Sequence, residues 1–280
     1  MLKLLFLLLF INIISYVSAQ YDTATYYTSN IYDFKHSLEY AEFLELSGQY
    51  NEAAREYERM LFMSENQENI IHALSICYIK TNQKEIAIRE IELLFPDPNL
   101  MHRKNKLDYS KLCLLNNDFD KAFIFSNQHV NNSENKQYIE LYGYILQSRW
   151  SDAELYYSKI NNENYKNEYE LIRRGLNQKR RSPFLAGMFS AIMPGSGKYY
   201  TGEWKDGILG TIMIGGLAWQ AYRAFNKKGT ESAYGWITAS IGFGFYIGNI
   251  YGSAKSAKRF NKNKNDEILN DAKKIFITDF

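Results

Sequence analysis

Apolar residues recur with a helical period through the middle of the chain. Between positions 34 and 172, large apolar side chains stand three and four residues apart. This spacing places them on one face of an α-helix. Proline, which interrupts helices, occurs in this region only at Pro96 and Pro98. The pattern predicts an all-α domain over residues 34–175.

The same domain repeats itself. Four similar polar phrases, GQYNEA, NQKEIA, NDFDKA and SRWSDA, end at Ala53, Ala87, Ala122 and Ala153. The intervals between these alanines are 34, 35 and 31 residues. A period of this length is typical of stacked helix pairs, and each polar phrase then forms the turn between two helices.

Side-chain size follows the same period. A small residue stands twelve positions before three of the four alanines, with Leu141 as the exception. A large residue stands four positions after three of them, with Ser126 as the exception. At these residues the chain resembles the tetratricopeptide repeat (TPR) family, over about half of its length. The two departures leave open a looser solenoid of helix pairs.

The TPR resemblance implies a solenoid whose first helices line a concave, partner-binding surface. The implied inward positions are mixed in charge and partly aromatic. They are Glu42, Glu45, His72, Ile76, Lys111, Leu114, Tyr138 and Tyr142. Such a surface suits a peptide or helix of another protein. The alternative is a solvated face without a ligand, because solenoids also serve as spacers.

The N-terminus has the pattern of a secretory signal peptide over residues 1–19. Lys3 precedes an apolar run over residues 4–14, and small residues follow up to Ala19. Cleavage would leave a flexible mature N-terminus over residues 20–33 and an exported, periplasmic repeat domain in the cell envelope. An uncleaved anchor is the alternative.

Three uncharged windows follow the repeats, at residues 182–197, 207–222 and 232–254. A helix that crosses a bilayer needs about 20 mainly apolar residues. The third window is long enough, and the second is long enough if Asp206 and Arg223 lie at the two interfaces. The windows therefore predict a transmembrane module of two or three helices over residues 182–254. A basic tail with a short helix would follow over residues 255–280.

Small residues recur every four positions in the third window. They are Ser240, Gly244, Gly248 and Gly252. Small side chains let helix backbones approach closely inside a membrane. The spacing predicts a tight, glycine-rich helical hairpin packed along this ridge, or alternatively self-association of two copies through it.

The start of this module carries the motif P-G-x-G-x-x-Y-x-G. It resembles a small bacterial envelope membrane domain of unknown function. The matching residues are Pro194, Gly195, Gly197, Tyr200, Gly202 and Gly207, preceded by Ser182 and Pro183. The resemblance implies a membrane location but no activity. The included letters GSGK do not form a nucleotide-binding P-loop, because Ile192 replaces its first glycine and Tyr199 its final Ser/Thr.

Charge is distributed unevenly around a net value of +2. Residues 176–280 contain 15 Lys and Arg but 7 Asp and Glu, a net charge of +8, whereas residues 1–175 contain 18 and 24, a net charge of −6. The basic residues flank the apolar windows, so we expect membrane lipid as their partner and no nucleic acid.

Catalytic patterns are not apparent in the sequence. Cys77 and Cys113 are too few for a disulfide framework or a metal cluster. The four histidines fall in different repeats without partners at metal-ligand spacing. We therefore expect no catalytic residues, metal or cofactor, and interpret both cysteines as buried thiols.

Together these features predict a membrane-anchored, non-enzymatic helical-repeat scaffold that binds another cell-envelope protein or peptide. The alternative is an accessory subunit of an envelope transport or membrane-protein insertion complex, in which the glycine-rich hairpin acts within the membrane.

Overall fold

The computed structural model describes residues 32–63, 68–160 and 163–278. Within these ranges the chain is helical and contains no β-strand. This confirms the predicted all-α class. The chain divides into two compact units, of which the first ends at Asn131 and the second begins at Asn132. The expected signal peptide (1–19) and nearly all of segment 20–33 lie outside the described residues.

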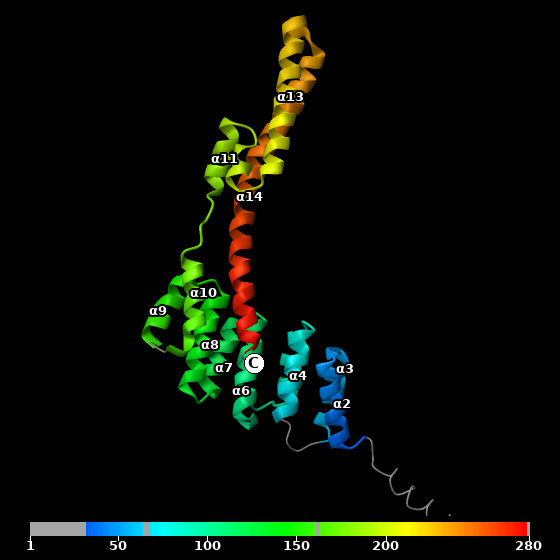
Figure 1. Cartoon of the computed structure of the whole chain (residues 1–280), viewed down its shortest axis with the longest axis vertical. Helices are drawn as coiled ribbons and strands as arrows, with labels where there is room; N and C mark the ends of the chain where they lie inside the picture. The colour runs from blue at the N-terminus through cyan, green and yellow to red at the C-terminus, as the bar shows by residue number, and fades with distance from the viewer. Residues whose placement is uncertain (1–31, 64–67, 161–162, 279–280) are drawn as a thin grey trace, which may run out of the picture. The chain divides into compact units, whose positions relative to one another are not determined.

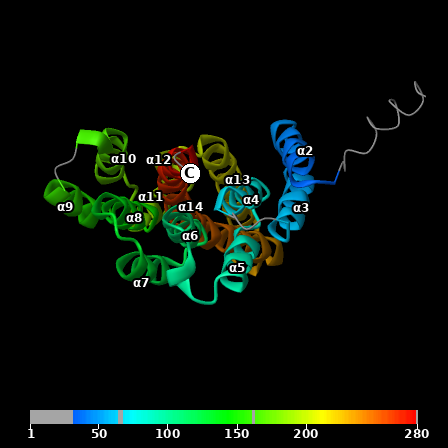
Figure 2. The same ribbon diagram turned by 90° about the horizontal axis from the view of Figure 1, so that it is seen from below.

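The first unit contains three successive helix pairs. Their bounds are α2 (Phe34–Leu46) with α3 (Tyr50–Leu61), α4 (Glu68–Lys80) with α5 (Lys84–Leu94), and α6 (Arg103–Leu115) with α7 (Phe119–His129). The short helix η1 (Pro98–Leu100) separates the second and third pairs. The first pair packs on the second, and the second packs on the third (Figure 2).

The second unit contains the fourth helix pair and the glycine-rich segment. Its elements are α8 (Ser133–Leu146), α9 (Trp150–Ile160), η2 (Glu163–Tyr165), α10 (Lys166–Leu176), α11 (Pro183–Ile192), α12 (Ser196–Tyr200), α13 (Trp204–Lys228), η3 (Gly229–Glu231) and α14 (Ala233–Thr278). Figure 1 shows α14 running beside α13 and then beside α8 and α10. We name α11–α14 up to residue 256 the hairpin module.

One helix therefore replaces two predicted elements. The last uncharged window and the short helix expected in the tail at residues 255–280 form one continuous α14 of 46 residues. The C-terminal part of α14 packs on α8 and α10. For this reason the fourth pair belongs to the same compact unit as the hairpin module, whereas the sequence placed a boundary after residue 175.

All four helix pairs share one turn geometry. The first residue of each polar phrase has a positive φ, namely 78° at Gly48, 58° at Asn82, 64° at Asn117 and 58° at Ser148. In the first turn, the N–H of Gln49 donates to the carbonyl of Leu44 at 2.9 Å, and the other three turns repeat this bond. This is the Schellman ending of a helix, which favours Gly and Asn. The sequence repeat is thus a repeat of helix pairs.

The positions at which the repeats share small side chains lie between packed helices. The four phrase-ending alanines, Ala53, Ala87, Ala122 and Ala153, are all buried. The small residues that precede them, Ala41, Ser75 and Ser110, are buried as well. Leu141, which replaces a small residue in the fourth pair, is also accommodated in full burial.

The predicted membrane spans require a correction. Among the described helices, none combines the length and the apolar character needed to cross a bilayer. The window 182–197 is divided between α11 and α12 by a turn at Pro194 and Gly195. The other two windows lie within α13 and α14, where many Gly, Ser and Thr residues and Asn249 lower the average hydropathy.

The contact between α13 and α14 lies on a different face from the predicted ridge. The buried positions of the two helices include a series with a seven-residue spacing, at Gly207, Ile214 and Ala221 on α13 and at Gly235, Gly242, Asn249 and Ser256 on α14. Across the pair, Gly235 lies against Phe225, Gly242 against Leu217 and Asn249 against Gly210. A seven-residue spacing stays on one side of an α-helix, whereas a four-residue spacing turns by about 40° at each step.

The predicted ridge consequently leaves the hairpin contact. Ser240, Gly244 and Gly248 are exposed, and no atom lies where a Cβ of either glycine would stand. Gly252 is half-buried beside the Lys198 side chain. The tight hairpin forms, but along the seven-residue seam.

Burial of the two cysteines predicts a loss of stability in alkali. Cys77 and Cys113 are free and have no exposed surface. Desolvation raises the pKa of each thiol from 9.0 to about 12. Each thiol is therefore neutral in the folded chain up to about pH 12, but ionises near pH 9 once unfolded.

We expect this contribution to be complete below pH 9 and to be lost between pH 9 and 12. The loss approaches about 1.4 kcal/mol per pH unit for each thiol. Urea unfolding of the full chain at pH 8, 9, 10 and 11 measures the slope. A Cys77→Ala/Cys113→Ala variant should show a shallower slope, and an unchanged slope would contradict the prediction.

Candidate functional site

A cavity of about 460 Å³ lies between the first helices of the repeats. We name it the repeat groove. Its lining includes residues of α2, α3 and α4, namely Phe34, Leu38, Glu42, Tyr57, His72 and Ala73. Two of the residues predicted to face inward, Glu42 and His72, line this cavity from neighbouring helix pairs.

Hydrogen bonds fix the polar residues around the repeat groove. The hydroxyl of Tyr57 donates to Glu45 Oε2 at 2.9 Å, and burial of the ring, with this bond, raises the pKa of Tyr57 far above its ordinary value. His72 Nδ1 lies 2.8 Å from the buried Asp108 carboxylate. Glu42 remains exposed at the groove. The groove therefore offers an apolar floor with carboxylates beside it.

Four other predicted groove residues do not line this cavity. Glu45 is half-buried on α2, where it accepts from Tyr57. Ile76 is half-buried on α4, and both Lys111 and Leu114 are buried on α6. Their side chains offer little surface to a partner.

The last two predicted groove residues are covered by the C-terminal end of α14. The ring of Phe276 stacks on Tyr138 with centroids 5.5 Å apart, and lies 4.5 Å from the ring of Tyr142. The Tyr142 hydroxyl donates to the buried Glu168 at 2.8 Å. Phe276 itself has no exposed surface. In the fourth pair, the predicted partner surface already holds a helix of the same chain.

Polar contacts hold this helix in place along its length. The indole Nε1 of Trp150 donates to Asn265 Oδ1 at 3.3 Å, and Asn265 Nδ2 donates to Ser148 Oγ at 2.8 Å. Arg174 pairs with Asp271 at 2.7 Å. The end of α14 is thus a docked element of the fourth pair.

Sequence reasoning missed the residues that make this contact. Ile268, Ala272 and Phe276 are buried and stand four residues apart on α14. This spacing marks one apolar helix face. The signal was present in the sequence, but it carried no information about which surface the face would cover.

The motif residues of the hairpin module build a compact turn. Gly195 has a φ of 89°, and its N–H donates to Asn249 Oδ1 at 3.0 Å. Thr211 Oγ1 donates to the carbonyl of Pro194 at 2.7 Å. The turn between α11 and α12 is therefore tied to both α13 and α14.

The remaining motif residues permit close packing. A Cβ on Gly197 would overlap the carbonyl of Ala186 on α11, and one on Gly207 would lie 3.0 Å from Gly195 O. The Tyr200 hydroxyl accepts from the N–H of Ser182 at 3.2 Å, and Gly202 has a φ of 86° before α13. These contacts give the motif a structural role in the helix turns.

The hairpin module has small, partly polar side chains in its interior and large apolar side chains on its surface. This is the reverse of the distribution usual for a protein folded in water. The interior of the module holds hydroxyl pairs, such as Ser190 with Ser253 and Thr201 with Ser256, each 2.7 Å apart. Its surface exposes large apolar residues. These include Phe184, Ile192, Leu209, Ile212, Trp219, Ile237, Phe243, Ile247 and Tyr251.

Neither a metal site in the described residues nor a similar known protein indicates a function. No group of three or more His, Cys, Asp or Glu residues is positioned to hold a metal ion in residues 32–63, 68–160 and 163–278. No protein-family model, curated protein or solved structure matches this chain.

Removal of the Phe276 ring should release the end of α14 locally. Loss of a buried phenylalanine costs about 3–5 kcal/mol, which corresponds to a loss of protection of about 100-fold or more. We expect the amides of residues 265–278 to exchange hydrogen faster in Phe276→Ala, as measured by mass spectrometry. The exposed Lys274→Ala on the same segment should exchange as the wild type does. Equal protection in both variants would contradict the docking contact.

Proposed function

We propose that this chain is a non-enzymatic, TPR-like helical-repeat scaffold that binds a segment of another protein in its repeat groove. The hairpin module attaches the scaffold to a membrane. The observation that carries the membrane attachment is the reversed distribution of side chains in the hairpin module, and the contact of α14 with the fourth helix pair supports the partner binding.

The reversed distribution favours an apolar environment for the module. In water, a folded chain buries its large apolar side chains, and an extended exposed apolar patch marks an interaction surface. Lipid imposes no such demand, so helices in a membrane instead pack through Gly, Ser and Thr. The interior of the module is built largely from small residues together with Ile214, while many Ile, Leu, Met and Phe side chains of α13 and α14 face outward.

The ends of the module support the same environment. Trp204 and Tyr222 are both exposed on α13 and stand about 27 Å apart by the helical rise. This approaches the thickness of a bilayer's hydrocarbon core, about 30 Å, at whose boundaries Trp and Tyr are enriched. Between positions 207 and 222 the helix has no ionisable Asp, Glu, Lys, Arg or His, and Arg223, Lys227 and Lys228 follow.

The partner-binding part rests on an intramolecular precedent. In the fourth helix pair, Tyr138 and Tyr142 receive the amphipathic end of α14 through Phe276. Leu38 and Glu42 occupy the matching positions of the first pair, and they line the open repeat groove. We infer that this groove takes an amphipathic helix or peptide, with an apolar side chain in the cavity. A basic group of the partner would face Glu42.

Membrane attachment predicts sensitivity to charge on the exposed apolar face. The full chain should float with vesicles of phosphatidylcholine and phosphatidylglycerol and resist alkaline carbonate. Ile212→Lys and Phe243→Lys together should reduce the floating fraction strongly, since each lysine inside lipid costs about 3 kcal/mol. Leu155→Lys, at an exposed apolar residue of α9, serves as the matched control. Attachment is contradicted if the wild type stays in the aqueous fraction.

The repeat groove predicts position-dependent crosslinking to a protein. A photoreactive benzoylphenylalanine at Glu42 should give a discrete adduct in cells of the source organism. The same probe at Glu85, which is also exposed but lies on α5, should not. Ala73→Trp fills the cavity and should remove the Glu42 adduct while leaving the helical signal in circular dichroism unchanged. Equal adducts from both positions would reject the groove as the binding surface.

A further inference from the structure

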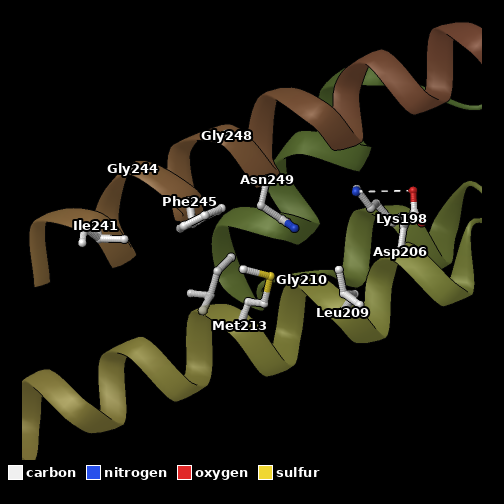
Figure 3. Close-up of a pocket in the computed structure, with 11 residues that line it drawn as sticks. Lys198, Asp206, Leu209, Gly210, Met213, Ile241, Gly244, Phe245, Gly248 and Asn249 are labelled. Atoms are coloured by element: carbon white, nitrogen blue, oxygen red, sulfur yellow. Dashed lines mark ion pairs between the residues drawn. The ribbon is translucent and has the colours of Figure 1, made fainter. Parts of the chain in front are cut away.

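A second cavity, of about 590 Å³, opens between α13 and α14 in the hairpin module. Figure 3 shows its floor and walls. The floor includes Gly244 and Gly248 of α14, where a Cβ would meet no other atom. The walls include Met213, Ile241 and Phe245. The absence of side chains on the floor leaves an apolar channel.

The volume of this channel is too small for an α-helix as its occupant. One turn of a helix about 10 Å wide occupies about 420 Å³, so the cavity would hold little more than one turn. An unbranched hydrocarbon chain is narrower and can follow the glycine floor between the flexible walls. The alternative of a second copy, expected from the ridge of small residues, would require α14 of the other copy to remain outside the channel.

A buried amide points into this cavity. Asn249 is only 8% exposed, and its Oδ1 accepts from the N–H of Gly195 at 3.0 Å. This bond fixes the orientation of the amide. Its Nδ2 lies over Gly210, at the cavity (Figure 3). The amide N–H groups are donors, so a ligand in the cavity that offers an acceptor can bond to them.

A cation stands at the same end of the cavity. The ammonium of Lys198, from α12, lies 3.7 Å from the carboxylate of Asp206 (Figure 3). The side chain of Lys198 is 22% exposed and that of Asp206 is 62% exposed. Their separation exceeds an ordinary hydrogen bond. The donors of Lys198 therefore remain available to an anionic oxygen beside Asn249.

We propose that this cavity binds one amphipathic lipid. Its hydrocarbon chain lies on the Gly244–Gly248 floor, and the phosphate or carboxylate oxygen of its headgroup accepts from Lys198 and Asn249. A fatty acid and a phospholipid share this chemistry. This proposal does not depend on the proposed membrane attachment. The cavity could bind one lipid whether or not the hairpin module enters a bilayer.

The test uses the purified full chain in mild detergent with two photoactivatable lipids. A fatty acid and a phosphatidylglycerol carry the same diazirine in the acyl chain, and the methyl ester of the fatty acid lacks the anionic head. We expect labelling at Met213, Ile241 and Phe245, mapped by mass spectrometry, from one or both anionic lipids. The methyl ester should label about tenfold less, since a hydrogen bond to a charged group is lost.

Paired variants separate this site from lipid bound over the whole surface. Gly248→Leu fills the floor and should remove the label, whereas Gly216→Leu adds the same side chain at an equally open glycine of α13 outside the cavity. Lys198→Gln should reduce labelling and Asp206→Asn should increase it, because Asp206 repels an anionic headgroup. These two substitutions preserve side-chain size, so a misfolded Gly248→Leu would not leave the question undecided.

Several results would overturn the proposal. One is label spread over outer residues such as Ile212 that Gly248→Leu leaves unchanged. Another is equal labelling by the methyl ester and the fatty acid. A third is crosslinking between two copies across Gly244 and Gly248 in place of lipid labelling. Vesicle flotation of Lys198→Gln distinguishes the two proposals, since attachment through the outer surface should persist when this site fails.

Discussion

The continuity of α14 is the constraint on which the second unit depends. One half of this helix packs on α13, and the other half docks Phe276 against Tyr138 and Tyr142. A rigid helix cannot satisfy both contacts unless the hairpin module and the fourth helix pair hold a fixed spacing. Asn261 and Asn265 reinforce the connection through bonds to Arg181, Ser148 and Trp150. The fourth pair is thereby joined to the module as one compact unit.

This arrangement relates the two proposed activities. The repeat groove is open in the first unit, whereas the corresponding positions of the fourth pair are closed by the chain's own helix. If the proposed scaffold function holds, similar helix pairs serve two purposes. The first pairs would receive a partner, and the last pair holds the C-terminal end of α14, the helix that also forms the hairpin module. Self-docking explains why Tyr138 and Tyr142 of the fourth pair do not form an open groove.

Polar chemistry inside the hairpin module sets its specificity. Helices that meet through glycine leave no side-chain volume to define their register, so hydrogen bonds must define it. Asn249 ties α14 to the turn at Gly195, and Thr211 ties α13 to Pro194. Because Gly244 and Gly248 have no side chains, the channel over them is unfilled. The proposed lipid would complete an interior that the chain itself leaves partly empty.

The sequence by itself determined the all-α class, the four helix pairs and their turns, because periodicity and turn chemistry act over a few residues. Gly48, Asn82, Asn117 and Ser148 show this directly, since each adopts the left-handed conformation where its polar phrase begins. Only the tertiary structure decided which faces meet. The ridge at Gly244 and Gly248 and the face of Phe276 are both visible as spacings. Whether such a face is buried, and against which helix, depends on contacts between residues more than a hundred positions apart, such as Phe276 and Tyr138. Local pattern carries no record of those contacts.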